Sequence, residues 1–323
     1  MEHQHRMIEV EGPKDPAVSG LTDGLTVIVP AFNEESGIGP VLGQLLQALA
    51  AIEIPYEVIV VDDGSTDRTA EIASSVEGVR VLHHRQNRGY GAAIKSGIRY
   101  ARHEFVCITD ADGTYPNHHV PDLLAALVAN NHDMVVGARV GDNVAIPLVR
   151  RPAKWAISQL ARAIAGASIP DINSGLRIFK RSVVRRFYRV LPDGFSFTTT
   201  ITLGMLANDY SVSFIPIEYY PRVGKSKIKP IRDTLNFVQL ILRIALYFSP
   251  LKIFLPLSGF FLLFGLAWGG ISYLVFGGIA DASMAVIIMA AIQIAVVGLL
   301  ADLINHRLPG LQNPAVFEDS RER

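Results

Sequence analysis

Two acidic residues separated by a single position, Asp110 and Asp112, carry the most specific chemical signal in this sequence of 323 residues. They directly follow an apolar run at residues 105–109, and carboxylates at the end of a buried strand are costly unless something pairs with them. A divalent cation does so, because hard cations bind carboxylates and complete their shell with water and substrate phosphates. We therefore predict that Asp112 and Asp110 hold Mg²⁺ or Mn²⁺ against a phosphorylated leaving group.

Two earlier polar clusters follow the first two apolar runs of the chain. The first includes Pro30, Asn33 and Glu34, and the second begins with the consecutive acids Asp62 and Asp63. Acids at a strand end can accept hydrogen bonds from a nucleotide base and from ribose hydroxyls. Ordinary loop chemistry explains the same residues equally well, because Asn, Ser and Thr cap helices and Gly favours tight turns. Both interpretations stay open at this level.

Basic residues form a third group of candidates. Arg139 follows the fifth apolar run, Arg177 lies in the sequence NSGLR, and Arg222, Ser226 and Lys227 lie in RVGKSK. Arginine suits bidentate contact with phosphate, and lysine suits a point-charge contact. The group therefore predicts phosphate binding. Attraction of the lysines to anionic lipid headgroups is an alternative that can hold at the same time.

Three weaker signals are interpreted as structural. The sequence GYG at residues 89–91 begins like a dinucleotide-binding fingerprint, but Ile94 occupies the third glycine position and the motif follows the third apolar run. The adjacent histidine pairs at 83–84 and 118–119 are predicted to be solvated loop residues rather than a metal site. The single cysteine, Cys107, lies in an apolar run and is predicted to be a core residue.

The elements that must position these residues alternate in type between residues 25 and 137. Short runs rich in Val and Ile predict strands, and the amphipathic stretches between them predict helices. This alternation predicts an α/β fold with a mostly parallel sheet covered by helices on both faces, and ligands then bind beyond the carboxyl ends of the strands. The predicted strands are residues 25–30, 56–61, 79–82, 105–109 and 134–137, and the predicted helices are residues 38–52, 66–75, 92–102 and 121–130.

The C-terminal third is predicted to enter a membrane. Residues 253–275 contain no charge, and residues 284–300 carry only Gln293 as a strongly polar interruption. Each stretch with its flanks can supply the roughly 20 helical residues that cross a hydrocarbon core of about 30 Å. Basic residues flank the outer ends of this hairpin, whereas the short connection has none. The positive-inside rule therefore places both ends in the cytoplasm, and the polar N-terminus lacks the apolar core of a signal peptide.

Five motifs occur in the order expected of one family: VPAFNEE, VVDDGSTDRT, NRGYGAAIKSGI, DADGTYP and INSGLRIFKRSVV. On these motifs the sequence resembles family 2 glycosyltransferases of the GT-A fold over residues 25–243. More narrowly it resembles dolichyl- and polyprenyl-phosphate sugar synthases, which share a basic element present here as Arg222, Gly224, Ser226 and Lys227. The hairpin is similar to that of bacterial members.

The resemblance implies a role for each candidate residue. Asp110 and Asp112 would form the acid-x-acid motif, with Asp112 as the principal metal ligand. Arg139, Arg222 and Lys227 would handle the phosphates of donor and acceptor. The nucleotide pocket would be lined by Pro30, Asn33, Glu34, Asp62, Asp63, Asp110 and Ala111, with Asp63 at the base. The acceptor would be contacted by Asp171, Ser174, Arg177 and Ser226.

Two positions depart from the family pattern. Thr114 stands where some mannosyl members carry glutamine, and Tyr90 stands where many relatives carry lysine. A preference for mannose is therefore not implied. The predicted parts are a flexible tail at 1–24, a GT-A catalytic domain at 25–230, a juxtamembrane amphipathic helix at 231–250, a transmembrane hairpin at 251–307 and a cytoplasmic tail at 308–323.

The function that we expect is inverting transfer of a sugar from a UDP- or GDP-linked donor to a polyprenyl phosphate at the cytoplasmic membrane face. A lipid phosphate is largely ionised near neutral pH, because its second pKa is about 6, so no strong general base is required. The alternatives are transfer to a glycolipid or a polysaccharide, and an inactive membrane scaffold. The Q-x-x-R-W motif of polysaccharide synthases is absent, since neither Trp155 nor Trp268 follows an arginine.

The charge balance bears on partners. Lys and Arg together number 30, as do Asp and Glu, so nothing in the net charge predicts a nucleic-acid partner. The expected partners are the nucleotide sugar, the polyprenyl phosphate and the membrane, and a homo-oligomer is compatible with the sequence.

Overall fold

A computed structural model describes residues 8–9, 22–139, 169–220, 246, 250–278 and 281–306. The chain divides into two compact units, Met1–Val149 with Ile169–Ile228 and Arg150–Ser168 with Lys229–Arg323, and each is described by itself. The expected tail at 1–24 lies almost wholly outside the described residues, as do the juxtamembrane helix at 231–250 and the tail at 308–323.

The first unit is built on one sheet of eight strands in the order β1-β4-β3-β2-β5-β7-β6-β8. All neighbouring pairs are parallel except those made by β7, which runs antiparallel to both β5 and β6. The mostly parallel α/β sheet is therefore confirmed. The strands are β1 (Ile8–Glu9), β2 (Thr22–Ala31), β3 (Tyr56–Asp62), β4 (Val79–His83), β5 (His103–Ile108), β6 (Met134–Arg139), β7 (Arg177–Lys180) and β8 (Val212–Ile217).

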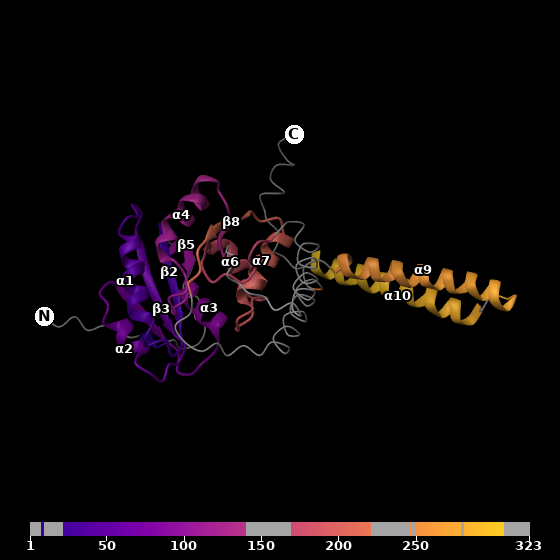
Figure 1. Cartoon of the computed structure of the whole chain (residues 1–323), viewed down its shortest axis with the longest axis horizontal. Coiled ribbons are helices and arrows are strands. Elements are labelled where there is room, and N and C mark those ends of the chain that lie inside the picture. Colours follow the sequence, from indigo (N-terminus) through magenta and orange to yellow (C-terminus); the bar gives the residue numbers. More distant parts are fainter. Residues whose placement is uncertain are drawn as a thin grey trace. The chain divides into compact units, whose positions relative to one another are not determined.

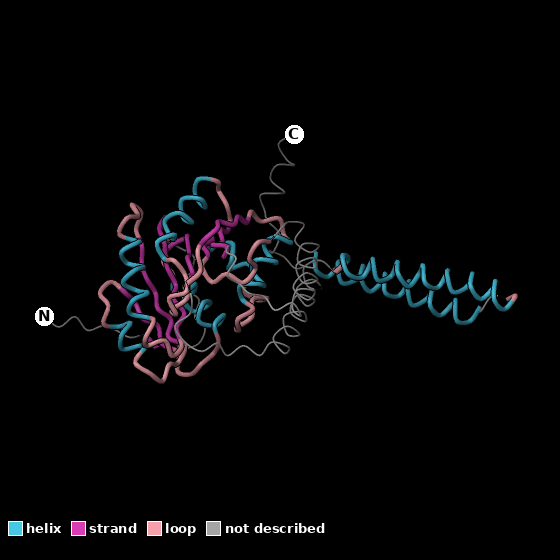
Figure 2. Tube along the Cα trace, viewed as in Figure 1, coloured by secondary structure: helices cyan, strands magenta, loops and turns pink. Residues whose placement is uncertain are grey.

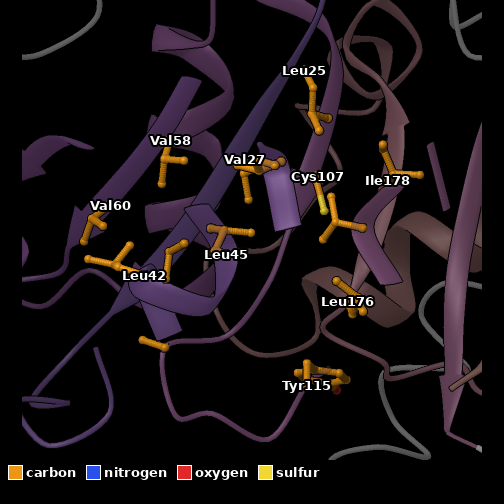
Figure 3. Packing of buried hydrophobic residues seen from close by; sticks show 14 of the residues in the cluster. Leu25, Val27, Leu42, Leu45, Val58, Val60, Cys107, Tyr115, Leu176 and Ile178 are labelled. Carbon is orange, nitrogen blue, oxygen red and sulfur yellow. The ribbon is translucent and has the colours of Figure 1, made fainter. Parts of the chain in front are cut away.

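Helices cover both faces of the sheet, as Figures 1 and 2 show. Val27 and Val29 of β2 belong to the core on one face, together with Leu42 and Leu45 of α1 (Figure 3). Ile28 points to the other face, where α3 approaches so closely that a Cβ on Gly97 would lie 2.5 Å from Ile28 Cγ2. The helices are α1 (Ile38–Leu49), α2 (Thr69–Ser74), α3 (Tyr90–Tyr100), the 3₁₀ turn η1 (Asn117–His119), α4 (Val120–Ala129), α6 (Arg181–Arg186) and α7 (Phe197–Ala207).

The central strands are apolar along their whole length because both of their faces are buried. Leu25, Val27, Ile28 and Val29 of β2 have no exposed surface, which is the burial expected of a strand that helices cover on both sides. Cys107 in β5 is also fully buried, so its predicted place in the core is confirmed. β1, β7 and β8 were not predicted. β1 lies in the segment that was expected to be a tail, and the regular alternation of the sequence stops after residue 137, before β7 and β8.

The second unit contains two long helices, α9 (Leu251–Phe276) and α10 (Asp281–His306). Both are long and apolar enough to cross a membrane, with candidate spans Leu251–Val275 and Ala282–Ile304. They pack antiparallel through small residues: a Cβ on Gly269 would lie 2.5 Å from Met284 Sδ, and Ser258 Oγ donates to the carbonyl of Ala291 at 2.8 Å. Glycine and serine at such contacts let apolar helices approach closely, and the predicted hairpin is present.

Candidate active site

The carboxyl ends of β2, β3 and β5 bring the polar clusters of the sequence to one edge of the sheet. Ala31, the last residue of β2, pairs with Asp62 of β3, and Asp62 pairs with His83 of β4. On the other side of β2, Thr109 donates its backbone N–H to Ile28 at 3.2 Å, immediately before Asp110. The parallel register is therefore what gathers motifs that lie some 80 residues apart in the chain.

Asp110 is a carboxylate held in a tight, largely buried place. Its Oδ1 accepts a hydrogen bond from the Tyr90 hydroxyl at 2.8 Å, and a Cβ on Gly175 would lie 2.6 Å from its Oδ2. Burial first and then the charge of Asp112 raise its pKa, to about 6, against the hydrogen bond from Tyr90, which lowers it. Asp112 Oδ1 accepts hydrogen bonds from the Thr114 hydroxyl at 2.7 Å and from the Thr114 backbone N–H at 3.1 Å.

Two neighbouring carboxylates, one of which raises the pKa of the other, are a donor set suited to a hard divalent cation. The cation would remove the repulsion between Asp110 and Asp112, and carboxylate oxygen is the ligand that Mg²⁺ and Mn²⁺ prefer. The positive charge of Arg139 acts in the opposite direction and offsets part of the rise in the pKa of Asp110. The residues present therefore fit the predicted ion.

The second predicted cluster holds its own loops together. Asp63 Oδ1 lies 2.6 Å from His84 Nδ1 and accepts the backbone N–H of Arg88 at 2.9 Å, while its Oδ2 accepts that of Gly89 at 2.8 Å. Only 5 % of the Asp63 side chain is exposed, and its contact with the base stays a prediction. Asp62 has no exposed side-chain surface and accepts the backbone N–H of Ser65 at 3.1 Å. The carboxylate of Asp62 is thus enclosed by the protein in this arrangement, and its contact with a nucleotide stays a prediction.

The histidines at the end of β4 correct another expectation. His84 is only 2 % exposed and bridges Asp63 to Ser96, whose Oγ lies 2.8 Å from its Nε2. His83 is partly exposed and its Nδ1 contacts Asp62. They are not solvated loop residues, because the register of β3 with β4 sets each histidine beside one of the two acids.

The first predicted cluster divides into buried and exposed parts. Pro30 and Ala111 are buried, so their side chains contribute packing rather than an open pocket wall. Asn33 is exposed at a φ of 55°, and its Oδ1 accepts the backbone N–H of Thr66 at 2.8 Å. The backbone N–H of Glu34 donates to Thr69 Oγ1 at 2.8 Å. These bonds join the loop after β2 to the loop after β3. Both loops are predicted to line the nucleotide pocket.

Arg139 and Asp171 were predicted separately and form one unit. The guanidinium is bidentate, with Nε 2.6 Å from Asp171 Oδ2 and Nη2 2.9 Å from Oδ1, and the Arg139 backbone N–H donates to the same carboxylate at 3.1 Å. Burial raises the pKa of Asp171, but the hydrogen bonds and charge of Arg139 outweigh it and hold that pKa below its ordinary value. The guanidinium also lies over the Tyr219 ring, 5.1 Å from its centre.

The predicted roles of Arg177 and Ser174 in acceptor binding are not supported. Arg177 is fully buried and donates from Nη1 to the Thr198 carbonyl at 3.0 Å and to Thr202 Oγ1 at 2.9 Å, and from Nε to the Ser174 carbonyl at 3.1 Å. Ser174 is also fully buried, and its hydroxyl donates to the carbonyl of Gly137 at 2.5 Å. Antiparallel β7 starts at residue 177 and turns this side chain toward α7, inside the protein.

Three predicted residues, Arg222, Ser226 and Lys227, lie outside the described residues. Two neighbours of the site were not predicted. Tyr90, inside the dismissed GYG sequence, bonds to Asp110, and Tyr115 accepts the backbone N–H of Gly175 at 2.7 Å. Tyr90 could have been identified from the sequence, because it departs from the family pattern within a motif that follows a strand.

This arrangement, a mostly parallel sheet with an acid-x-acid motif beyond its central strands, defines a nucleotide-sugar transferase of the GT-A fold. Residues 26–187 match the profile of Glycosyl transferase family 2, and residues 249–306 match that of the GtrB C-terminal hairpin. The chain belongs to glycosyltransferase family 2.

Three relatives are similar over more than half of this chain. The dolichyl-phosphate hexose transferase of Haloferax volcanii is 32% identical over 209 residues, which are 64% of this chain and 88% of that protein. The low-salt glycan biosynthesis hexosyltransferase Agl6 of the same organism is 29% identical over 70% of this chain and 55% of its own length. The dodecaprenyl-phosphate galacturonate synthase of Rhizobium johnstonii is 30% identical over 55% of this chain. The chain spans 53% of that synthase, so it covers only about half of two of these three relatives.

Solved structures support the fold. Glucosyl-3-phosphoglycerate synthase from Mycobacterium tuberculosis in complex with uridine diphosphate superposes with a TM-score of 0.55 at 18% identity, over 74% of this chain and 88% of that one. Its complex with Mn²⁺, UDP-glucose and phosphoglyceric acid gives a TM-score of 0.54 at 19% identity, over 69% of this chain and 79% of that one. At these identities the likeness establishes the GT-A fold.

Proposed function

We propose that this chain transfers a sugar from a nucleotide diphosphate sugar to a polyprenyl phosphate, with inversion at the anomeric carbon. The single observation that carries the proposal is that one chain combines the Asp110–Asp112 acid pair with a hairpin long enough to cross a membrane. Relatives named as dolichyl-phosphate and dodecaprenyl-phosphate sugar transferases support the same acceptor class.

The donor side rests on the strand-end residues. Asp112 and Asp110 would hold Mg²⁺ or Mn²⁺, and the bound ion would supply stabilisation of the negative charge on the departing nucleotide diphosphate. Asp63, with Asn33 and Glu34 on the adjoining loop, would border the base and ribose of a UDP- or GDP-linked donor. The complex of the structurally similar synthase from Mycobacterium tuberculosis with Mn²⁺ and UDP-glucose supports this arrangement.

The acceptor side rests on positive charge. A phosphate oxygen of the lipid would attack the anomeric carbon in line, as the bond from that carbon to the leaving diphosphate breaks. Asp171 fixes the Arg139 guanidinium through two hydrogen bonds of 2.6 and 2.9 Å. Arg139 can then offer its charge to a phosphate without reorganising. Arg222, Ser226 and Lys227 would complete the phosphate contacts.

The hairpin would place enzyme and acceptor in the same thin layer. We propose that both of its ends lie in the cytoplasm with the catalytic unit, following the basic residues that flank its outer ends. Sharing the membrane raises the effective concentration of the lipid without any new contact.

The experiment is a donor panel. Membranes that contain the protein are incubated with polyprenyl phosphate, Mg²⁺ or Mn²⁺, and labelled UDP- and GDP-sugars one at a time. Transfer of label into the organic phase from one donor, abolished by EDTA, is the expected result and names the sugar. Binding of a nucleotide sugar without an organic-phase product would instead favour a glycolipid or polysaccharide acceptor.

A further inference from the structure

The GYG sequence at residues 89–91, where α3 begins, packs against the loop at residues 191–196. Gly89 has a φ of 102°, and a Cβ on it would lie 2.5 Å from the carbonyl oxygen of Asp193. A Cβ on Gly91 would overlap the carbonyl oxygen of Pro192. Both glycines are therefore required by the close approach of residues 191–196, and not by a dinucleotide.

Hydrogen bonds and an ion pair hold this loop in place. The backbone N–H of Ala92 donates to the carbonyl of Asp193 at 3.0 Å. Lys95 Nζ lies 2.8 Å from Asp193 Oδ1 and also contacts the carbonyl of Leu191. Three polar contacts with α3 therefore fix this loop, in which Phe195 follows Gly194.

Tyr90, between the two glycines, connects this loop to the acid pair. Its hydroxyl donates to Asp110 Oδ1 at 2.8 Å, and its ring stacks on that of Phe195 with the ring centres 5.6 Å apart and the planes 17° apart. Phe195 is therefore one aromatic ring away from a carboxylate of the active site.

Phe195 is nevertheless 85 % exposed, more than any other large apolar side chain described in the catalytic unit, where the next is Val128 at 55 %. Exposed apolar area costs about 25 cal/mol per Å² when it could be covered instead. An anchored loop that keeps a phenyl ring in solvent beside the reacting groups therefore indicates a ligand that covers the ring.

We propose that Phe195, stacked on Tyr90, receives the hydrocarbon chain of the acceptor directly beyond its phosphate, while the Tyr90 hydroxyl positions Asp110. The inference rests on the proposed function, because it assumes a polyprenyl phosphate acceptor. An isoprene unit offers only hydrocarbon to the ring, whereas a sugar offers only the C–H groups of one face and carries hydroxyl groups that a phenyl ring cannot satisfy. The first isoprene units are thus the part of the substrates that Phe195 matches.

The test separates the two aromatic residues by their kinetic effects. Phe195→Ala is expected to raise the KM for farnesyl phosphate about tenfold, with the KM for the nucleotide sugar unchanged. Phe195→Leu, which keeps an apolar side chain, should recover most of this loss. Tyr90→Phe keeps the stacked ring but removes the hydroxyl, so the acceptor KM should stay constant while kcat falls and the Mn²⁺ concentration for half-activation changes.

The matched control is Tyr56→Ala. Tyr56 is an exposed aromatic residue, 40 % exposed, at the start of β3 and hence at the opposite edge of the sheet. It should leave all these constants unchanged, and thermal unfolding of each variant checks that it folds.

Two results in the variants would overturn the inference alone. An unchanged acceptor KM in Phe195→Ala would show that the chain does not lie on this ring, and an increase in the donor KM alone would assign the ring to the sugar. Wild-type protein that transfers sugar to no polyprenyl phosphate would overturn the proposed function itself, and this inference with it, so the two failures differ at the first measurement.

Discussion

At the scale of single residues, the acid pair is held in a state that favours a cation. Asp110 is largely buried beside Asp112, and burial first and then the charge of Asp112 raise its pKa to about 6. Tyr90 and Gly175 leave its carboxylate little room to move. A group so placed is already oriented before any ligand arrives, and such preorganisation is what makes charged active-site groups effective.

Arg177 provides the first prediction, because its role is to hold the fold. Arg177→Met keeps the volume of the side chain but leaves the carbonyl of Ser174 without the donor that Arg177 supplies, whereas the carbonyl of Thr198 still accepts the Thr202 hydroxyl at 2.8 Å. An unsatisfied buried acceptor costs about 1–3 kcal/mol, so we expect a loss of about 2 kcal/mol in the free energy of unfolding, seen as a lower thermal midpoint. A variant with wild-type stability and a raised acceptor KM would return Arg177 to the phosphate site.

His119 provides a prediction about pH. Its Nδ1 lies 2.9 Å from Asp122 Oδ2 and its Nε2 lies 3.1 Å from Glu218 Oε2, and the ring of His118 lies beside it, tilted by 39°. Burial lowers the pKa of His119, but the hydrogen bonds to Asp122 and Glu218 outweigh it, so the folded pKa is raised above the unfolded value of about 6.5.

The sign follows from that direction. Stabilisation by protonated His119 is complete below the unfolded pKa of about 6.5 and is lost as the pH rises through the folded pKa. The difference in thermal midpoint between wild type and His119→Asn should therefore be larger at pH 5.5 than at pH 9. A difference that is the same at both pH values would contradict this assignment.

The residues also show what sequence can reveal. Asp110 and Asp112 were identified correctly as a close acid pair at a strand end, because strand position and residue type suffice for that. Arg139 and Arg177 look alike in sequence, yet one lies partly exposed at the end of a strand and the other is sealed under α7. The two arginines differ in exposure because β7 runs antiparallel to its neighbours, and no local sequence pattern predicts that direction.

At the scale of elements, close packing of α3 on β2 sets the position of the GYG sequence. Gly97 and Gly43 are both helical glycines, but a Cβ on Gly97 would meet Ile28 Cγ2 at 2.5 Å, whereas a Cβ on Gly43 in α1 would meet nothing within 4 Å. The two positions form a matched pair for testing whether this contact is tight.

Substitution by alanine should act in opposite directions at the two positions. Gly43→Ala is expected to stabilise the protein by about 0.5–1 kcal/mol, because alanine loses less backbone freedom in a helix. Gly97→Ala is expected to destabilise it by about 1–2 kcal/mol, since overpacking against Ile28 exceeds the same helical gain. Thermal midpoints of both variants measure the difference, and an equal rise at both positions would refute close packing at Gly97.

The elements were predictable where the pattern was regular. All five expected strands and four expected helices are present within a few residues, because buried parallel strands read as continuous Val- and Ile-rich runs. β8 was missed because Val212–Ile217 is only half buried, with exposed Pro216 inside it. β7 has only four residues, Arg177–Lys180, and begins and ends on a basic side chain, so it gives no apolar run.

At the scale of the whole molecule, the chain joins a catalytic unit to a membrane hairpin. The exposed faces of α9 and α10 are apolar, with Leu263 69 % and Leu274 83 % exposed, as helices surrounded by lipid require. Membrane association thus follows from the hairpin itself, while the side on which its ends lie stays a prediction.

Single cysteines can test that orientation. The native Cys107 is fully buried and should not react with a hydrophilic maleimide. In intact cells we expect Gly278→Cys, between the two helices, to be labelled from outside, and Ser320→Cys to be labelled only after the membrane is opened. Labelling of Ser320→Cys in sealed cells, with Gly278→Cys protected, would reverse the orientation.

The central claim is that the acid pair at the carboxyl ends of the strands is required for sugar transfer to a lipid phosphate. The most direct measurement is the initial rate at which purified protein in lipid vesicles moves labelled sugar onto polyprenyl phosphate, for wild type, Asp112→Asn and Glu53→Gln. Glu53 is an exposed acid before β3 and serves as the matched carboxylate-to-amide control. We predict a loss of about a hundredfold or more in Asp112→Asn only, whereas equal rates in all three proteins would contradict the account.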